Sequence, residues 1–435
     1  MKRFNKKCIA MAAGIVIATN LSLTQVSCVK DYFDPAIVDT IIKQVSPVHS
    51  IDETHTWELA SHSTVNFSAN MPVGAKLLQV LTENPRESGD AVVVGQTDIA
   101  DGGNVTLTLS YPTLCTMLYA ALVDENGAYT VTAFSPEDSR VDFSAPVFVS
   151  ERIAYTPPLQ TYSYCYEEEF PEPGDYDYND VVLHISQVRT GERELQINVQ
   201  LAAVGADNQI AACVRLIGYE FGDIESITTV NDDSFNKNVP KQLLGVQTKR
   251  DVLLKGLNNE AVINLFCDAH WATGDVLTEN YGQIQRKKYN VSNNPGSDNV
   301  KLVPRTITYV VTFVDGSRLN EFTLDTLDPF IIKEYNGGRF EVHMNEYRFA
   351  QTLYEYSATE IKNLPWALKV PTGKFCHPLA GQNIGFIMED IETGDPILFG
   401  AYMQKGKSFG EWAADHTQCT DWYFYPSSTR VFNPY

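Results

Sequence analysis

Residues 166–182 read YEEEFPEPGDYDYNDVV, and the rest of the chain is best understood outward from this stretch. It is crowded with acidic side chains on both sides of Gly174, and an apolar run from Val181 to Ile185 follows it and predicts a β-strand. The acidic residues are Glu167, Glu168, Glu169 and Glu172 before the glycine, and Asp175, Asp177 and Asp180 after it. So many like charges repel one another unless something neutralises them.

A bound cation is the favoured interpretation of this stretch, because Ca²⁺ accepts several carboxylate and carbonyl oxygens in flexible geometry. A sharp turn at Gly174 would let alternate side chains after it converge. Glu167 would approach from the preceding segment with Glu168 as a second candidate, and Tyr176 and Tyr178 would form an apolar underside. The predicted ligands are Glu167, Asp175, Asp177, Asn179 and, if the backbone bends after Asn179, Asp180. The ion would then act as a structural staple where two domains meet.

The plain alternative is a solvated acidic turn in which Asp and Asn side chains cap the backbone. The spacing does not fit an EF-hand, since no glycine follows the third ligand and no glutamate occupies the twelfth loop position.

The acidic stretch resembles the signature of the LruC-domain family of bacterial surface lipoproteins. The matching residues are Tyr166, Glu167, Glu168, Phe170, Pro171, Gly174, Asp175, Tyr176, Asp177, Tyr178, Asn179, Asp180, Val181 and Val182. Glu168 replaces the aspartate that is usual in the family. Further blocks in the family's order extend the resemblance over residues 163–435, including the segments around His270, Ile331, Trp366 and Trp412. The resemblance implies a β-rich surface domain, but the family has no established biochemical activity.

The N-terminus predicts export and lipid anchoring. A basic segment and an apolar core precede Val26-Ser27-Cys28, and this order is typical of a signal peptide over residues 1–27. The last three residues resemble the lipobox of bacterial lipoproteins, although Gln25 stands where leucine is usual, so Cys28 is the predicted lipid-attachment residue. Lys30, Asp31 and Asp34 behind it resemble an export tag, which predicts an outward-facing protein in the outer membrane.

Composition agrees with a folded protein outside the cytoplasm. Hydrophobic residues make up 44% of the chain, and the formal net charge of −21 argues against nucleic-acid binding, which requires basic surfaces. None of the cysteines forms a CxxC pair, so a zinc ribbon is excluded. Cys115, Cys213 and Cys267 lie in apolar runs that are typical of buried free thiols.

The predicted fold class is mainly β. Alternating strands at 63–67, 75–81, 104–109, 116–122 and 129–134 predict a β-sandwich over residues 56–150, with a hairpin at Asp124–Gly127. Strands at 194–201 and 306–314 belong to a larger β-rich LruC-like domain over residues 163–435 with few short helices. Residues 28–55 are predicted to form the tether, a short helix at 35–45 and a linker. The best short helix candidate elsewhere is 408–415.

Three functions remain open at this point, and a non-enzymatic surface protein for binding or adhesion is favoured. A carbohydrate-binding module is suggested by Trp412, Trp422, Tyr423, Phe424 and Tyr425. A hydrolase could use Glu167 and Asp177 as a carboxylate pair, but the sequence contains no GxSxG, HExxH or phosphate-loop motif. His343 and Glu341 fall on one strand face, where a plain contact is favoured over a metal pair. The predicted partners are the membrane, through the lipid, and an extracellular glycan or protein.

Overall fold

The computed structural model describes residues 51–434 except 53, 71–73, 101, 144–150, 170–173, 237–251, 274–277, 281–282, 295, 297–298, 336–337, 345–363 and 391–392. The chain divides into two compact units, Met1–Ser46 and Pro47–Tyr435, and every described residue belongs to the second. The predicted signal peptide, Cys28 and the predicted helix at 35–45 lie outside the described residues. Within the described part, no helix has the length and apolar character needed to cross a bilayer.

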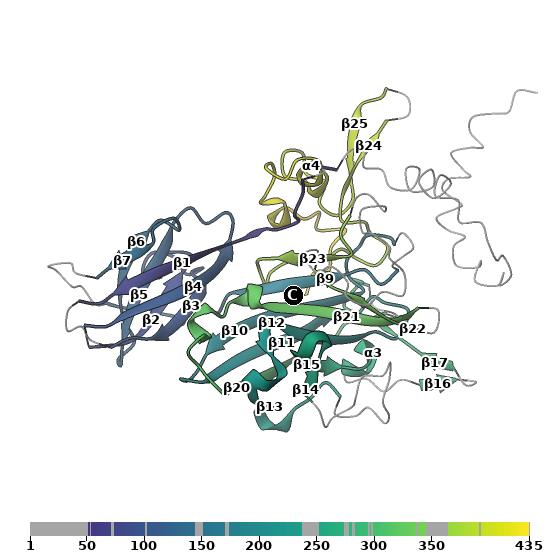
Figure 1. Cartoon of the computed structure of the whole chain (residues 1–435). Helices are drawn as coiled ribbons and strands as arrows, with labels where there is room; N and C mark the ends of the chain where they lie inside the picture. The colour runs from purple at the N-terminus through teal and green to yellow at the C-terminus, as the bar shows by residue number, and fades with distance from the viewer. Residues whose placement is uncertain are drawn as a thin grey trace, which may run out of the picture. The chain divides into compact units, whose positions relative to one another are not determined.

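The first part of the described chain is a β-sandwich, as the sequence predicts (Figure 1). Its two sheets enclose one core that includes Phe67, Leu78, Leu109, Leu122 and Phe134. One sheet has the order β4 (Asn104–Pro112), β1 (Ala60–Ser68), β7 (Arg140–Asp142). The other has the order β3 (Val93–Asp98), β2 (Ala75–Leu81), β5 (Leu118–Asp124), β6 (Ala128–Phe134), β8 (Glu151–Arg152).

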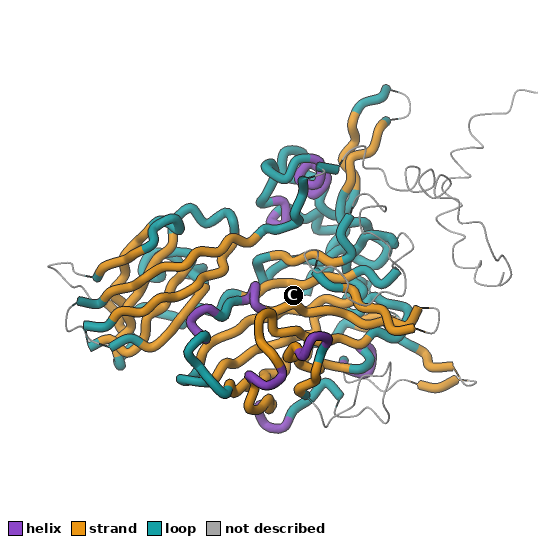
Figure 2. The backbone as a smooth tube through the Cα atoms, in the orientation of Figure 1, coloured by secondary structure: helices purple, strands orange, loops and turns teal. Residues whose placement is uncertain are grey.

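The larger part is built on two further sheets packed face to face (Figure 2). The six-stranded sheet has the order β13 (Ile224–Thr229), β20 (Arg305–Phe313), β11 (Glu194–Ala203), β10 (Val181–Arg189), β9 (Thr161–Tyr166), β23 (Ala367–Val370). The five-stranded sheet has the order β14 (Leu253–Lys255), β15 (Glu260–Phe266), β12 (Ala211–Glu220), β21 (Leu327–Tyr335), β22 (Gly338–Val342). Strict alternation in β11 sends Leu195, Ile197 and Val199 into the shared core and leaves Gln196, Asn198 and Gln200 on the outer face.

The remaining elements are short. Strand pairs are β16 (Thr278–Asn280) with β17 (Gln283–Gln285), β18 (Lys288–Tyr289) with β19 (Asn299–Val300), and β24 (Phe386–Glu389) with β25 (Pro396–Phe399). The described α-helices are α3 (Ala269–Ala272) and α4 (Phe409–Ala414). Single 3₁₀ turns are η1 (Phe221–Asp223), η2 (Val230–Asp232), η3 (Leu257–Asn259), η4 (Leu319–Glu321), η5 (Leu324–Thr326) and η6 (Trp422–Phe424).

Several predicted elements are confirmed. The hairpin between β5 and β6 turns at Asp124–Gly127, where the Asp124 Oδ1 accepts hydrogen bonds from the backbone of Asn126 and Ala128. Helix α4 begins after Ser408, whose Oγ accepts from the Glu411 backbone nitrogen at 3.1 Å while the Glu411 carboxylate returns to Ser408. All six cysteines of the described part are free thiols, and Cys213 and Cys267 are buried as predicted, whereas Cys115 is only partly buried.

One end of the outer face of the six-stranded sheet is covered by the described residues of 371–434, here called the C-terminal segment. Cys165 and Val182 of the sheet share a core with Phe409, Trp412 and Trp422 of this segment. A second hydrophobic layer therefore lies on the side of the sheet away from the main core.

Residues preceding β1 join the same layer. The Trp57 ring lies 5.4 Å from the Trp412 ring, and the His55 Nε2 lies 3.1 Å from the Trp412 carbonyl oxygen. Asp52 forms an ion pair with His416. The described residues of the predicted linker are thus fastened to the C-terminal segment.

Replacement of Trp422 should test how much this second layer contributes to stability. Trp422 is fully buried with its ring 4.9 Å from Tyr402, 5.0 Å from Phe409 and 5.6 Å from Trp412. We expect Trp422→Ala to lower the free energy of unfolding by about 3–5 kcal/mol, measured by urea denaturation. The control is Phe424→Ala, two residues away on an exposed ring, which should change it by less than about 0.5 kcal/mol. Equal losses in both variants would contradict the assignment of Trp422 to a packed core.

Candidate metal centre

The acidic loop, residues 167–180, connects two neighbouring strands of the six-stranded sheet. Strands β9 and β10 run antiparallel, and their last rung pairs Tyr166 with Val181. The two ends of the loop therefore start side by side, and acidic residues from both ends are brought together. The Glu168 backbone nitrogen accordingly donates to the Asp180 Oδ2 at 2.6 Å.

The backbone of the loop wraps around the carboxylate of Glu167. Tyr176 and Tyr178 both have positive φ, at 54° and 50°. Their backbone nitrogens donate to the two oxygens of Glu167, at 3.3 Å from Tyr176 and 2.5 Å from Tyr178. Positive φ is costly for bulky residues, so the surrounding packing has to hold it.

That packing is the apolar underside that the sequence predicts. Tyr176 and Tyr178 are buried in the same core as the C-terminal segment. The Tyr178 hydroxyl donates to the Pro365 carbonyl oxygen at 2.7 Å, and the Tyr176 ring lies 5.7 Å from Phe386. The aromatic side chains thus anchor the turn that places the acids.

Two groups of three carboxylates share Glu167. In one, oxygens of Glu167, Asp175 and Asp177 lie within 4.8 Å of one another, and in the other those of Glu167, Glu169 and Asp180 do so. Glu167 is fully buried and Asp177 and Asp180 are nearly so. The structure therefore places four acids around the buried carboxylate of Glu167.

This concentration has a clear electrostatic cost. Burial raises the pKa of Glu167 well above its ordinary value, and the nearby carboxylates of Glu169, Asp180, Asp177 and Asp175 raise it further. The pKa values of the four neighbours are raised as well, with burial as the largest cause in each case.

The basic residues next to the loop offset only part of this negative charge. Lys288 lowers the pKa of Asp175, but its ammonium lies 3.0 Å from Asp207. Lys333 donates to the carbonyl oxygen of Glu168. Among the described residues, Glu168 Oε2 and Glu169 Oε2 are buried without a hydrogen-bond partner.

The predicted ligands do not all converge. Glu167, Asp175, Asp177 and Asp180 join the two groups, whereas the Asn179 side-chain nitrogen donates to the Pro378 carbonyl oxygen at 3.1 Å. A Cβ at Gly205 would lie 1.8 Å from the Asn179 Oδ1, so this glycine lets the amide approach the backbone.

Glu169 is a member of the cluster that the prediction left out. Side chains two residues apart in an extended segment share a side, and Glu167 and Glu169 satisfy this rule. Glu168 faces elsewhere: its Oε1 accepts from the backbone nitrogens of Asp207 at 2.8 Å and Asn208 at 3.2 Å. Side-chain alternation along residues 167–169 therefore predicts that Glu169, and not Glu168, lies on the same side as Glu167.

Gly174 is required by the closeness of the acids. A Cβ there would lie 2.3 Å from Glu167 Oε2 and 2.9 Å from Glu169 Oε2. No side chain larger than hydrogen fits without moving these carboxylates.

The loop fastens separate segments of the larger part to one another. Asp177 Oδ2 accepts from the Gly381 backbone nitrogen at 2.8 Å, and the Asn383 side-chain nitrogen donates to the Asp175 carbonyl oxygen at 2.8 Å. These contacts hold the C-terminal segment. The described contacts between the sandwich and the larger part, such as Ser110 Oγ with the Tyr162 hydroxyl at 2.6 Å, lie away from the acidic loop.

The geometry also bears on the other predicted chemistries. Glu167 and Asp177 are buried with their oxygens within 4.8 Å, so no sugar ring fits between them as a glycosidase requires. Trp412, Trp422 and Tyr423 are buried in the core and cannot offer their faces to a sugar, which leaves Phe424 exposed and Tyr425 partly so.

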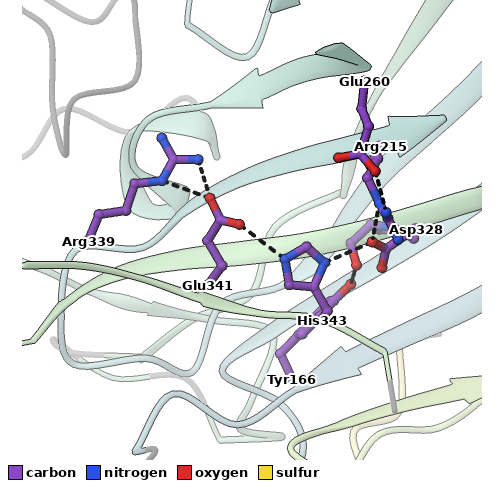
Figure 3. Close-up of polar contacts among 8 residues, drawn as sticks. Tyr166, Arg215, Glu260, Asp328, Arg339, Glu341 and His343 are labelled. Atoms are coloured by element: carbon purple, nitrogen blue, oxygen red, sulfur yellow. Dashed lines mark hydrogen bonds and ion pairs between the residues drawn. The ribbon is translucent and has the colours of Figure 1, made fainter. Parts of the chain in front are cut away.

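A second buried polar network has balanced charges (Figure 3). His343 Nδ1 lies 2.8 Å from Asp328 Oδ2, and its Nε2 lies 3.1 Å from Glu341 Oε2. The two arginines beside it are Arg215, which binds Asp328 and Glu260, and Arg339, which binds Glu341. With His343 protonated, three positive groups face three carboxylates. The predicted contact between His343 and Glu341 is confirmed, and the network reads as structural.

Residues 193–393 match the model of a family described as a domain of unknown function, DUF4842. No curated protein matches the sequence. One solved structure that matches is the crystal structure of a "Putative lipoprotein from Bacteroides ovatus", with 15% identity and a TM-score of 0.50. The match covers 83% of this chain and 100% of that chain, and at this identity it shows a shared fold. The LruC resemblance remains a prediction, since the matched family carries another name and its match begins after the acidic loop.

The His343 network predicts a pH-dependent contribution to stability. Burial lowers the pKa of His343, but hydrogen bonds to Asp328 and Glu341 more than offset this and leave the pKa above its ordinary value. The imidazolium contribution is therefore complete below the unfolded pKa of about 6.5 and is lost as the pH rises through the folded pKa.

We expect His343→Gln to cost about 1.5–3 kcal/mol at pH 6 and progressively less at higher pH. Urea denaturation of both proteins between pH 6 and 9 measures this difference. If the difference in free energy of unfolding between the two proteins increased with pH, His343 would be neutral in the folded state.

Proposed function

We propose that this chain is a lipid-anchored protein outside the cytoplasm, in which a calcium ion held by the acidic loop fastens the C-terminal segment to the six-stranded sheet. Its role is binding or adhesion, and the ion is structural. The observation that carries the proposal is the pair of buried carboxylate groups that share Glu167.

Charge balance supports a cation at this place. Carboxylates that are buried together must either take up protons or meet a positive charge. In the His343 network the chain supplies that charge itself, with two arginines and an imidazolium. Among the described residues, the basic groups placed at the acidic loop above are Lys288, which also binds Asp207, and Lys333, which donates to the Glu168 carbonyl oxygen, against five clustered carboxylates.

Calcium fits the donor set better than other common ions. Its bonds to oxygen are about 2.4 Å long, so two ligands on opposite sides of one ion lie about 4.8 Å apart. The carboxylate oxygens of each group lie within 4.8 Å. The donors are all oxygens, which suits a hard cation, and Mg²⁺ would require several retained waters in strict octahedral geometry. Glu167, Asp175 and Asp177 would hold the ion on one side, with Glu169 and Asp180 completing it or holding a second.

The lipid anchor rests on the N-terminal sequence and gains support from the structural neighbour. The basic and apolar segments before Cys28 resemble a lipoprotein signal peptide. The matching protein from Bacteroides ovatus carries the word lipoprotein in its name. An outward-facing position in the outer membrane is the proposed location, where calcium modules bind at about 10⁻⁴–10⁻³ M.

Calcium should stabilise the fold measurably. At about 10 mM calcium and a dissociation constant of about 10⁻⁴–10⁻³ M, the free energy of unfolding should rise by about 1.4–2.7 kcal/mol over that in chelator. Thermal and urea unfolding of the mature protein in calcium and in EDTA measure the rise. Equal midpoints in the two conditions would refute the calcium role.

Charge-neutralising variants sharpen this test. Asp175→Asn and Glu169→Gln each remove one negative charge from a different carboxylate group. Neither side chain accepts the Tyr176 and Tyr178 backbone hydrogen bonds, which go to Glu167. Each variant should be more stable than the wild type in EDTA, because repulsion falls, and should respond less to calcium. The matched control is Glu125→Gln in the exposed β5–β6 turn, which should keep the full calcium response.

Lipid attachment at Cys28 can be tested independently of calcium binding. Cys28→Ser expressed in a Gram-negative host should move the protein from the detergent phase to the aqueous phase of a Triton X-114 partition, because the acyl chains are lost. Cys8→Ser, within the signal peptide, is the control and should leave the protein in the detergent phase. Protease treatment of intact cells should degrade the wild-type protein if it faces outward, and full protection would contradict that orientation.

A further inference from the structure

The uncovered part of the outer face of the six-stranded sheet forms the floor of an open cleft. The C-terminal segment covers one end of this face, and the other end looks toward the β-sandwich. The cleft has a volume of about 1090 Å³ and is lined by the sheet, by sandwich residues around Leu114–Met117 and by Phe424. That volume is at the upper end of the range for small-ligand sites.

The floor carries two rows of neutral hydrogen-bonding side chains across three strands. In the first row, Gln200 Nε2 donates to Thr306 Oγ1 at 3.1 Å. Its Oε1 then faces His184 Nδ1 at 3.1 Å, so this nitrogen carries the hydrogen. In the second row, Asn198 Nδ2 donates to Ser186 Oγ at 3.2 Å.

These rows leave both donors and acceptors for a ligand. Thr306 and Ser186 accept from the amides, so their own hydroxyl hydrogens remain to be donated. His184 Nε2 has no hydrogen-bond partner among the described residues, but it is buried and therefore is not open to a ligand in the cleft. A hydroxyl group, which both donates and accepts, is the natural complement of such a surface.

The walls of the cleft combine exposed apolar side chains with polar ones, which include Glu83, Asp90 and Lys374. The side chains of Phe424, Met117 and Leu114 are exposed to 58%, 41% and 39%. An exposed aromatic ring beside a field of neutral hydrogen-bonding groups suits a ligand with an apolar face and hydroxyls at its edge.

The backbone argues against an extended peptide as the ligand. Strand β10 is paired with both β9 and β11, and β11 is paired with both β10 and β20. Peptides that dock on sheets use unpaired backbone groups of an edge strand, and the floor consists of interior strands. Recognition must therefore run through the side chains.

We propose that this cleft binds a neutral oligosaccharide, with Gln200 and Thr306 contacting its hydroxyls and Phe424 stacking on a sugar ring. The floor residues are uncharged, and the remaining lining contains Glu83 together with Lys374, which lies 3.5 Å from Asp90. Two carboxylates against one ammonium disfavour an anionic polysaccharide. The inference rests on the binding role proposed above but not on the calcium ion, so the two can fail separately.

The test uses the mature protein in calcium and a panel of neutral hexasaccharides of glucose, xylose, mannose and galactose, with hexagalacturonate as the anionic comparison. Isothermal titration calorimetry should detect at least one neutral sugar and no binding of the anionic one. Gln200→Ala and Phe424→Ala should each weaken binding about tenfold, as expected for one lost polar or stacking contact.

Matched controls exclude general effects. Gln196→Ala changes the same residue type on the same face of β11 but outside the cleft, and Phe399→Ala removes an exposed phenyl ring on β25. Both should bind as the wild type does.

Absence of binding to every neutral sugar at millimolar concentration would overturn the inference, as would wild-type affinity in Gln200→Ala and Phe424→Ala. An undiminished calcium response in the same samples would leave the calcium proposal standing. Sugar binding that persists in Asp175→Asn would show that the cleft works without the intact ion site.

Discussion

Repulsion among the buried carboxylates of the acidic loop is the constraint that the surrounding structure has to satisfy. The pairing of Tyr166 with Val181 brings the two acidic arms together, and the left-handed turns at Tyr176 and Tyr178 aim two backbone nitrogens at Glu167. Those two hydrogen bonds stabilise one carboxylate but not five. The cation proposed above would complete the balance with the fewest additional groups, since one ion can contact several of the oxygens at once.

The two faces of the six-stranded sheet have three different surroundings. Its inner face, with residues such as Leu183 and Ile197, packs on the five-stranded sheet in the main core. One end of its outer face supports the C-terminal segment through Cys165 and Val182. The other end displays a neutral polar surface beneath the sandwich. Strand alternation separates the core from the outer face, because neighbouring residues of β10 point to opposite faces. The two roles of the outer face are separated by position along the strands.

Much of the fold was readable from local pattern. Strands β4, β11 and β20 follow alternation that the sequence displays, β2 follows an apolar run, and the β5–β6 turn and the cap of α4 follow short-range chemistry. The convergence of acids was also readable, because charge crowding is visible in a linear sequence. Which of the residues join the cluster was harder to predict. Asn179 binds Pro378, which lies 199 residues away, and Glu169 takes the place beside Glu167 that was predicted for Asn179.

Features formed by residues that are far apart in the chain could not be predicted from the sequence. Trp412, Trp422 and Tyr423 look like a sugar platform in sequence, yet the sheet face that buries them is formed by β9 and β10. The cleft is assembled from the sandwich, three strands and η6, so no continuous motif marks it. Asp328, the stronger partner of His343, lies 15 residues before it and gives no signal of its own.

The way in which residues 51–59 meet the fold has a mechanical meaning for a protein held at its N-terminus. Tension transmitted along the chain from an anchored end reaches Asp52, His55 and Trp57 before it reaches the first strand of the sandwich. Drag from flow or from a captured particle would therefore load the contacts with Trp412 and His416 first. The hydrogen bonds between β1 and β4 would bear no load until the contacts of Asp52, His55 and Trp57 with Trp412 and His416 had broken.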